Sequence, residues 1–388
     1  MNTSYSDHYP SSDLSHLAPT PAPFLSISRR TRTTPFTQQL AAAGVSGYTV
    51  YNHMLLPTFF RSVEEDYYHL KQHVQLWDVA CERQIEVSGP DAQALLQLVI
   101  PRDLSKLRAG QCIYTPIVDQ DGMVLNDPLT IKLDDERFWV SIADSDIGLL
   151  LKGLALGSQM RARVHEPDVS PLAVQGPKAV LLMQRLFGAE IANLKFFRAK
   201  QFEFRNHDLW ISRSGYSKQG GYEIYLTPAS LGEALWDDLM NAGQDLEVRA
   251  GCPNLIERIE GGLLSYGNDM TSANTLAECT LDKYFDIDEA PLCIGYAALK
   301  REQLDGGPAR QVRMLRIDGD RVPACIDPWP LYTPSAPAGQ VTSAAWSPDL
   351  GENVAIGMVE AAYWDLGRVL NLSCADGSRR TATVKGLV

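Results

Sequence analysis

The chain has 388 residues, of which 45% are hydrophobic and 21% charged, and this composition is typical of a folded protein with two or three domains. Its formal net charge of −12 argues against nucleic acid as a partner, because phosphate binding requires clustered Lys and Arg side chains. No stretch approaches the roughly 18 consecutive apolar residues that span a bilayer, so we expect no membrane partner.

The first segment, residues 1–27, is polar and rich in Pro and Ser. It lacks the apolar stretch of a secretory signal and predicts a disordered tail. The chain also carries seven scattered cysteines without a CxxC pair, and seven histidines without an HExxH pair. These patterns favour reduced thiols, a cytoplasmic location and no metal site.

A repeated motif marks two similar units in the next part of the chain. Residues 86–97 read EVSGPDAQALLQ, and residues 173–184 read AVQGPKAVLLMQ. In both copies a strand pattern ends at Gly, Pro follows in the expected first helical turn, and an apolar run at helical spacing comes next. Two such copies predict a duplicated α+β unit.

Further strand patterns and one more helix pattern follow each copy. After the first come IYTPIVDQDGMVLNDPLTIKL and RFWVSIA, with Asp121-Gly122 as the expected hairpin turn, and then the helix pattern SDIGLLLKGLAL. After the second come QFEFRNHDLWISRS, GGYEIYL and the helix pattern ASLGEALWDDLMNAG. We therefore expect a two-part α+β body whose halves span residues 28–170 and 171–305.

The stretch RSGYSKQGGYEIYL, residues 213–226, ends in an alternating strand. Glu223 and Tyr225 point to one face of this strand, and the apolar and aromatic side chains around them point to the other. If the apolar face packs on a core, the acid and the tyrosine point together into a cleft or into water. Gly220-Gly221 permit a positive φ and a close approach of the backbone to a ligand. An edge strand with a solvated acid is the alternative that these residues leave open.

From about residue 308 the pattern changes to short alternating runs, such as QVRMLRID, VAIGMVE and RVLNLS, between Gly, Pro and Asp turns. This pattern predicts a small all-β sandwich or barrel over residues 306–388. The chain contains no GxxxxGK[ST], GxSxG or strand-end GxGxxG motif, so P-loop nucleotide binding, α/β-hydrolase chemistry and Rossmann dinucleotide binding lack support.

Five longer stretches occur in this order: QDGMVLNDP (120–128), LAVQGPKA (172–179), RSGYSKQGGYEIYL, AGCPNLIERIEGGLLSYGNDM (250–270) and VTSAAWSPDLG (341–351). Over residues 28–388, the chain resembles the folate-dependent aminomethyltransferase (glycine-cleavage T-protein) family. Within that family it is most similar to the demethylases that act on dimethylsulfoniopropionate, through SRRTRTTPFTQ (28–38), YTVYNHMLLPT (48–58) and LWDVACERQIEVSG (76–89).

The resemblance implies an α+β cloverleaf of three domains, in which duplicated α/β halves and a C-terminal β-rich domain, barrel-like or jelly-roll-like, surround a central folate channel. It implies tetrahydrofolate as the methyl-accepting cosubstrate. Glu223 would accept hydrogen bonds from the pterin ring, and Tyr225 would line the same channel. Asp127 corresponds to the family's acid near the reacting nitrogens of folate and is the expected catalytic residue. Further residues in family positions beside folate or the methyl-transfer point are Tyr114, Tyr216, Ser217 and Met54.

Simpler roles stay open for several residues when the sequence is considered alone. Asp127 is also typical of a turn-capping acid. Tyr114 and Tyr225 are also typical of half-buried aromatic residues in strands. Met54 is equally typical of core filler. Arg258 and Glu260 in ERIEGG are expected to form a structural charge pair on a helix. Lys218 is a candidate partner for the substrate carboxylate, or a solvated loop lysine.

The resemblance implies transfer of a methyl group from dimethylsulfoniopropionate, a small sulfonium zwitterion, to tetrahydrofolate, giving methylmercaptopropionate and 5-methyltetrahydrofolate. A neutral thioether leaves readily, so the protein needs to align the reactants rather than supply a nucleophile. Two alternatives stay open: demethylation of another small donor, such as a betaine or a methoxy-aromatic acid, and a folate-binding protein without turnover. An ether donor would need an acid to protonate its leaving oxygen. A homodimer is one possible oligomeric state.

Overall fold

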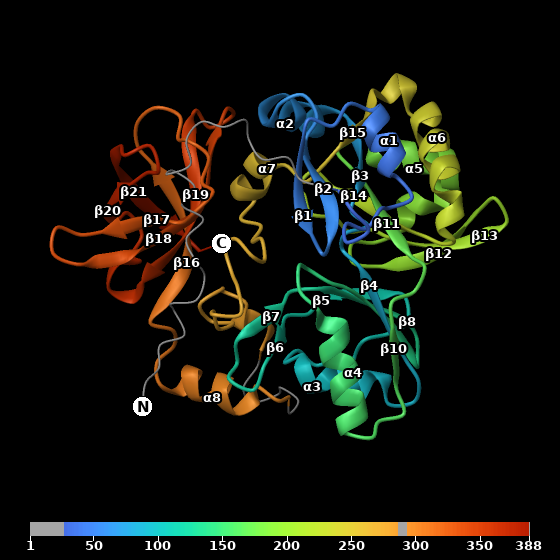
Figure 1. Ribbon diagram of the computed structural model, residues 1–388, viewed down its shortest axis with the longest axis horizontal. Coiled ribbons are helices and arrows are strands. Elements are labelled where there is room, and N and C mark those ends of the chain that lie inside the picture. The colour runs from blue at the N-terminus through green and yellow to red at the C-terminus, as the bar shows by residue number, and fades with distance from the viewer. Residues whose placement is uncertain (1–26, 286–292, 388) are drawn as a thin grey trace.

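The computed structural model describes residues 27–285 and 293–387. Figure 1 shows two bodies built from a sheet with helices and a third that is an all-β barrel. The predicted disordered tail, 1–27, lies outside the described residues apart from Ile27. Over the described ranges, no helix is long and apolar enough to cross a membrane.

The first sheet has five antiparallel strands in the order β10-β4-β9-β8-β5. Helices α3 (Ala92–Val99) and α4 (Ile147–Gly157) pack against it, and Val87, Phe138 and Val140 contribute strand side chains to the shared core. The strands are β4 (Gln84–Ser88), β5 (Gln111–Tyr114), β8 (Leu129–Asp134), β9 (Arg137–Ser141) and β10 (Arg163–His165).

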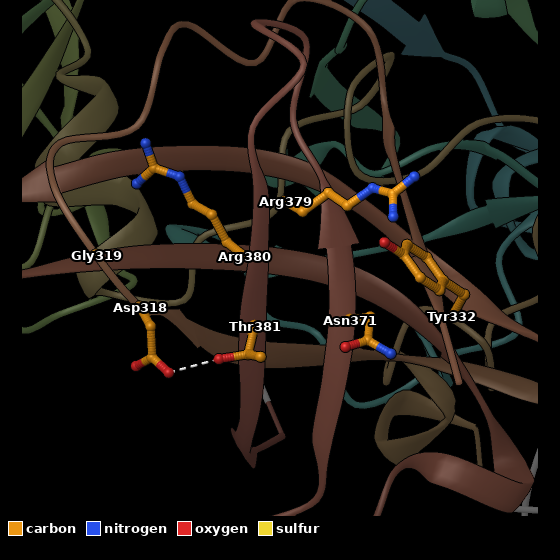
Figure 2. Close-up of a pocket in the computed structure, with 7 residues that line it drawn as sticks. All are labelled: Asp318, Gly319, Tyr332, Asn371, Arg379, Arg380 and Thr381. Carbon is orange, nitrogen blue, oxygen red and sulfur yellow. Dashed lines mark hydrogen bonds between the residues drawn. The ribbon is translucent and has the colours of Figure 1, made fainter. Parts of the chain in front are cut away.

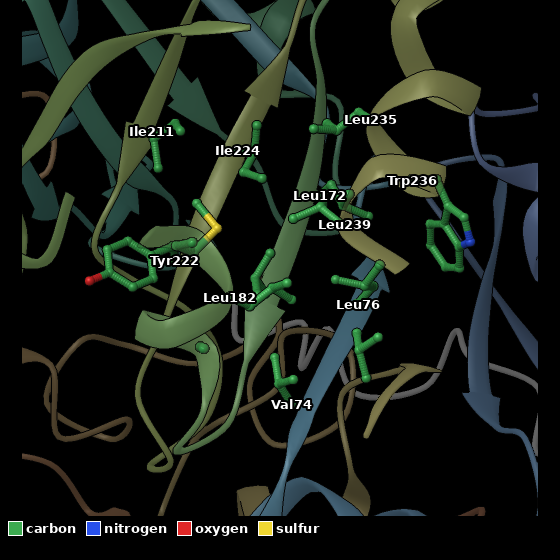
Figure 3. Packing of buried hydrophobic residues seen from close by; sticks show 14 of the residues in the cluster. Val74, Leu76, Leu172, Leu182, Ile211, Tyr222, Ile224, Leu235, Trp236 and Leu239 are labelled. Atoms are coloured by element: carbon green, nitrogen blue, oxygen red, sulfur yellow. The ribbon is translucent and has the colours of Figure 1, made fainter. Parts of the chain in front are cut away.

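The second sheet has six strands in the order β12-β13-β14-β11-β3-β15. Strands β3 and β15 run parallel to each other, whereas the other neighbours are antiparallel. Side chains such as Leu76, Leu172 and Ile224 pack under the helices, as Figure 3 shows. The elements are α1 (Thr37–Ala42), β3 (Val74–Asp78), β11 (Ser170–Gln175), α5 (Ala179–Phe187), β12 (Ala199–Phe204), β13 (His207–Ser212), β14 (Gly221–Leu226), α6 (Gly232–Ala242) and β15 (Val248–Gly251).

The strand orders confirm the predicted duplication and add one element to it. When β4, β5, β8, β9 and β10 are matched in chain order to β11, β12, β13, β14 and β15, the two sheets have the same strand order. The difference is β3, which lies between β11 and β15 and precedes the first repeat in the chain. The first half of the chain therefore supplies one strand to the second sheet, and the boundary between residues 170 and 171 stays a prediction.

Both copies of the repeated motif end their strand at a glycine for the same steric reason. Gly89 and Gly176 have φ of +114° and +122°, which residues with side chains rarely adopt. A Cβ on Gly89 would lie 2.5 Å from the carbonyl oxygen of Arg161, and one on Gly176 would lie 2.4 Å from that of His73. The proline that follows lies in a turn just before α3 or α5, rather than in the first helical turn as predicted.

We expect Gly176→Ala to lower the free energy of unfolding by about 2–4 kcal/mol, because the new methyl group meets backbone and the φ is unfavourable. Gly188→Ala is the matched control: Gly188 has φ of +85°, but no atom lies within 4 Å of its added Cβ. The control should cost about 1–2 kcal/mol. Urea unfolding followed by circular dichroism measures both, and equal losses would contradict the close approach at Gly176.

Two short hairpins lie beside the sheets. Strands β6 (Ile117–Val118) and β7 (Val124–Asn126) pair around the turn at Asp121-Gly122, which confirms that prediction. The other hairpin joins β1 (Gly47–Tyr51) to β2 (Met54–Phe59) through Asn52 and His53, with φ of +48° and +64°. Positive φ at both central residues is the signature of a type I′ turn, which favours Asn. Helix α2 (Val63–Gln72) follows this hairpin.

The C-terminal part is a closed barrel with strand order β16-β19-β18-β17-β20-β21, so the barrel is confirmed and the sandwich is not observed in the described residues. Its core includes Leu315, Trp329 and Val341. Helices α7 (Leu255–Glu260) and α8 (Tyr296–Leu304) precede it, and the boundary between residues 305 and 306 stays a prediction. The strands are β16 (Arg310–Ile317), β17 (Trp329–Tyr332), β18 (Pro337–Ser347), β19 (Glu352–Glu360), β20 (Val369–Ser373) and β21 (Arg379–Gly386).

Candidate functional site

Asp127 and Tyr114 lie together beside the first sheet. Tyr114 ends β5, Asp127 follows β7, and the Tyr114 hydroxyl donates a hydrogen bond of 2.8 Å to Oδ2 of Asp127. The Tyr114 ring packs edge-on against Tyr284, with ring centroids 5.4 Å apart. Burial raises the pKa of Asp127 to about 7, and the hydrogen bond from Tyr114 opposes this shift. Asp127 can therefore change its charge near neutral pH, which suits a functional carboxyl better than a turn cap.

Glu223 and Tyr225 lie on β14, an interior strand between β13 and β11, so the edge-strand alternative is wrong. The predicted alternation is confirmed. Tyr222, Ile224 and Leu226 lie in the core of the second sheet, and Figure 3 shows the first two of these side chains. Glu223 and Tyr225 occupy the opposite face and are 9% and 1% exposed.

Three hydroxyl groups hold one oxygen of the Glu223 carboxylate. Ser214 Oγ, Tyr225 OH at 3.3 Å and Ser212 Oγ at 3.4 Å all donate to Oε2. Burial raises the pKa of Glu223, and these hydrogen bonds lower it. No donor from the described part of the chain reaches Oε1. An ionised carboxylate can accept bonds at both oxygens, so Oε1 is left for N–H groups of a ligand.

The loop before β14 is held by side chains of its neighbours. Ser217 Oγ donates to Oε1 of Gln175 at 2.7 Å, and the Lys218 backbone N–H donates to Oε1 of Glu257 at 2.6 Å. A Cβ on Gly221 would lie 2.4 Å from the Gln175 side-chain nitrogen. The protein's own side chain therefore approaches Gly221 closely, whereas no atom lies within 4 Å of a Cβ added to Gly220, whose φ is +80°. Close approach of a ligand to these glycines stays a prediction. A role for the Lys218 ammonium in substrate binding stays a prediction.

Met54 is buried at 5% exposure and pairs with Tyr51 across the β1–β2 hairpin. Burial raises the pKa of Tyr51, and repulsion by Glu82 and then by Asp127 raises it further. The hairpin therefore lies near Asp127. Direct contact of Met54 with folate stays a prediction.

A third acid near Asp127 and Glu223 was missed by sequence reasoning. Glu82 lies on the link from β3 to β4, which joins the two sheets, and its side chain is partly exposed. Burial, then repulsion by Glu223 and Asp127, raise the pKa of Glu82 to about 8. We call these three acids the carboxylate cluster. Within residues 27–285 and 293–387, no Lys, Arg or His forms an ion pair with any of them.

The prediction of a charge pair between Arg258 and Glu260 is wrong, because each side chain has another partner. Arg258 Nη1 instead donates to Oδ2 of Asp269 at 2.8 Å, and the two side chains are 8% and 0% exposed. Glu260 accepts hydrogen bonds of 2.9 Å from the Tyr67 hydroxyl and lies 3.7 Å from Nζ of Lys71. Positions i and i+2 of a helix point to different sides, which explains the separate partners.

The Arg258–Asp269 pair connects the loop before β14 to the barrel. Arg258 Nη1 donates to the carbonyl oxygen of Leu263 at 3.2 Å. The Tyr216 hydroxyl lies 3.2 Å from the same oxygen and donates to the carbonyl oxygen of Leu264 at 2.7 Å. Arg258 Nη2 donates to Oγ of Ser343 in β18 at 2.6 Å. This buried network fixes the position of Tyr216, the residue predicted to contact folate.

We expect the unliganded protein to lose about 1–3 kcal/mol of stability as the pH rises from 6 to 9. Asp127 and Glu82 have folded-state pKa values of about 7 and 8, raised from 3.8 and 4.5. Their contribution is fully present below the unfolded-state pKa values and is lost as the pH rises through the folded-state values. Thermal melts across this range measure the loss. If the melting temperature of the double variant Asp127→Asn, Glu82→Gln falls with pH as steeply as that of the wild-type protein, these two acids are not the cause of the loss.

A groove of about 550 Å³ lies elsewhere, on the barrel, as Figure 2 shows. None of the predicted site residues lines it, so it is not the candidate site. Its lining residues are Asp318, Gly319, Tyr332, Asn371, Arg379, Arg380 and Thr381. In the part of the chain that the structure describes, no group of three or more His, Cys, Asp or Glu side chains is arranged to hold a metal ion.

Chemically, the carboxylate cluster offers acceptors and negative charge without a nucleophile. Oε1 of Glu223 can accept an N–H group, and Asp127 can accept a proton near neutral pH. A positively charged ligand would relieve the mutual repulsion of the three acids. The cluster is therefore suited to a ligand that brings N–H donors and positive charge.

Comparison with known proteins gives the relatives of this chain. The family model of the GCVT N-terminal domain matches residues 36–289, and that of the glycine cleavage T-protein C-terminal barrel domain matches residues 294–388. Dimethylsulfoniopropionate demethylase DmdA from Ruegeria pomeroyi is 51% identical over 359 residues, which cover 92% of this chain and 98% of that protein. An aminomethyltransferase from Lysinibacillus sphaericus is 27% identical and covers 85% of this chain and 90% of that protein.

A solved structure supports the same relationship. The crystal structure of the glycine cleavage system aminomethyltransferase T from Bartonella henselae superposes with a TM-score of 0.80 and is 25% identical in sequence. The match covers 92% of this chain and 97% of that one, and thus includes the duplicated unit and the barrel. The chain belongs to the glycine-cleavage T-protein (aminomethyltransferase) family.

Proposed function

We propose that the protein transfers a methyl group from dimethylsulfoniopropionate to tetrahydrofolate, giving methylmercaptopropionate and 5-methyltetrahydrofolate. The observation that carries this proposal is 51% identity with a dimethylsulfoniopropionate demethylase over 92% of the chain. The carboxylate cluster supports it, because its open acceptor and its negative charge suit both reactants.

The described residues fit a reduced folate. Bound tetrahydrofolate supplies the nucleophile, its N5 amine. Oε1 of Glu223 lacks a donor from the described residues and is free to accept N–H groups of the pterin, while Oε2 is held by three hydroxyls. Tyr216 and Ser217 hold the loop that precedes this strand. Such pre-positioned acceptors bind and orient a ring without rearrangement.

Asp127 is the proposed catalytic residue. As the methyl group moves, positive charge leaves the donor sulfur and develops at the accepting nitrogen. An ionised Asp127 stabilises that charge, and its pKa of about 7 allows its carboxylate to accept a proton near neutral pH. Tyr114 fixes the orientation of Asp127 through the 2.8 Å hydrogen bond to Oδ2. No acid is needed for the departing thioether, because it leaves as a neutral molecule.

Incubation of the purified protein with tetrahydrofolate and dimethylsulfoniopropionate tests the proposal. We expect methylmercaptopropionate and 5-methyltetrahydrofolate to form in equal amounts, measured by liquid chromatography with mass detection. If products form only with a betaine or a methoxy-aromatic acid, that compound rather than dimethylsulfoniopropionate is the methyl donor. Saturable folate binding without product from any donor would indicate a binding protein and overturn the enzymatic proposal.

We also propose a cytoplasmic location. All seven cysteines are free thiols in the structure, and six of them are buried. Free thiols are typical of proteins kept in a reducing compartment, which supports this proposal.

A further inference from the structure

The position of Glu82 follows from the connection between the two sheets. β3 ends at Asp78 in the second sheet, and β4 begins at Gln84 in the first, so Glu82 lies on the crossing segment. The Glu82 backbone N–H donates to the carbonyl oxygen of Val79 at 2.9 Å, and its own carbonyl accepts from Nε2 of Gln84 at 2.9 Å. Both backbone groups are satisfied, so the segment has a defined conformation.

A chain of hydrogen bonds ties this segment to Asp127. Asn52 Nδ2, at the positive-φ turn of the β1–β2 hairpin, donates to the carbonyl oxygen of Cys81 at 2.9 Å and to that of Ala143 at 3.0 Å. Asn126 Nδ2 donates to the same Ala143 oxygen at 3.1 Å. Cys81 directly precedes Glu82, and Asn126 directly precedes Asp127. One buried side chain, that of Asn52, therefore holds the two acids on neighbouring segments.

The Glu82 carboxylate has no partner among the described residues. Glu223 has three hydroxyl donors and Asp127 has one, but no hydrogen bond or ion pair in those residues reaches the Glu82 side chain. The titratable groups coupled to it electrostatically are Tyr51, Cys81, Tyr216, Asp127 and Glu223. Each of these is an acid, a thiol or a phenol, and none brings positive charge.

We propose that Glu82 recognises the positive charge of the methyl donor and thereby selects a cationic donor over a neutral one. This inference rests on the proposed function and assigns a residue to its substrate class. A sulfonium has no N–H or O–H group, so it cannot saturate a hydrogen-bonding site. It is recognised by charge and by aromatic faces, and Glu82, with the coupled Tyr51 and Tyr216, offers both. Asp127 and Glu223 keep their roles toward folate.

The test compares dimethylsulfoniopropionate with 4-methylpentanoate, an isostere that keeps the carboxylate but has an uncharged carbon in place of the sulfonium sulfur. Calorimetry without tetrahydrofolate, so that no methyl transfer occurs, measures both dissociation constants. We expect the wild-type protein to bind the sulfonium ligand at least about 10-fold more tightly than the isostere. In Glu82→Gln, the preference should fall to less than about 3-fold, because the sulfonium ligand loses affinity and the isostere does not. The KM for the donor should rise more than kcat falls.

Two controls distinguish a loss of charge recognition from a folding defect, and the demethylation assay tests the proposed function separately. Glu136→Gln removes an exposed acid at the β8–β9 turn and should leave the preference unchanged. Folate affinity within about 3-fold of wild type shows that Glu82→Gln is folded. Equal binding of the two ligands by the wild-type protein would overturn the inference, and so would an unchanged preference in Glu82→Gln. Either result leaves the proposed function intact as long as the wild-type protein demethylates the sulfonium donor.

Discussion

Asp127→Ala should lower kcat by about 100–1,000-fold while tetrahydrofolate still binds measurably. The carboxylate is proposed to stabilise charge that develops during methyl transfer, and an interaction of this kind affects the reacting state more than the bound state. Glu223 and the loop before β14 are unchanged in this variant, so the pterin retains its main acceptor. Steady-state kinetics and calorimetric folate binding measure the two effects separately.

Asp121→Ala is the matched control, because Asp121 is an exposed acid in the turn between β6 and β7. It should retain wild-type turnover. If Asp127→Ala turned over at the wild-type rate, Asp127 would lose its proposed role. If folate binding and turnover fell together, Asp127 would be a binding residue rather than a catalytic one.

The pH dependence of the same reaction gives an independent measurement. If the ionised form of Asp127 is required, kcat/KM should rise with pH through about 7, the pKa of this carboxyl in the free protein. The hydrogen bond from Tyr114 favours the ionised form and lowers that pKa. Tyr114→Phe removes this bond, so the rise should move to higher pH. A rise that stays at the same pH in Tyr114→Phe would show that another group of the carboxylate cluster controls it.

Sequence reasoning predicted those parts of the fold that have local signals. The alternation around Glu223 and the strand-to-helix switch at the Gly-Pro motif are properties of short segments, and both describe the structure correctly except for the proline, which lies in the turn before the helix. Insertion of β3 into the second sheet has no such signal, because its parallel partner β15 lies about 170 residues away in the chain and no turn connects them. Pairing between distant strands is decided by the assembled core rather than by adjacent residues.

The same distinction explains which site residues were found. Asp127 and Glu223 lie in stretches that resemble the family, Tyr114 was assigned a family position beside folate, and the structure brings Asp127 and Tyr114 into contact. Glu82 also lies in such a stretch, LWDVACERQIEVSG (76–89), but on a connection without periodicity. Its relation to Asp127 depends on Asn52, thirty residues earlier in the chain. Arg258 and Glu260 were mispaired although their spacing alone argued against a contact, since residues two apart on a helix do not face each other.

Glu223→Ala should weaken tetrahydrofolate binding by about 10–100-fold, the largest effect on affinity that we expect from a single change. Hydrogen bonds to a charged acceptor contribute about 1.5–3 kcal/mol, and Oε1 of Glu223 is the acceptor that the described residues leave open. Because β14 is an interior strand and its apolar face stays packed, the substitution should leave the sheet intact. Calorimetric titration with tetrahydrofolate measures the loss.

Glu203→Ala on β12 provides the control, because this glutamate is exposed on the same sheet and has no role in the proposed site. Tyr225→Phe adds a second comparison. The phenol donates to Oε2 of Glu223 at 3.3 Å, so its removal leaves the ligand-facing oxygen in place and should cost less than Glu223→Ala. If Glu223→Ala bound folate as tightly as wild type, the exposed oxygen would face something other than the pterin. Asp127 would then need a different partner to bring the accepting nitrogen beside it.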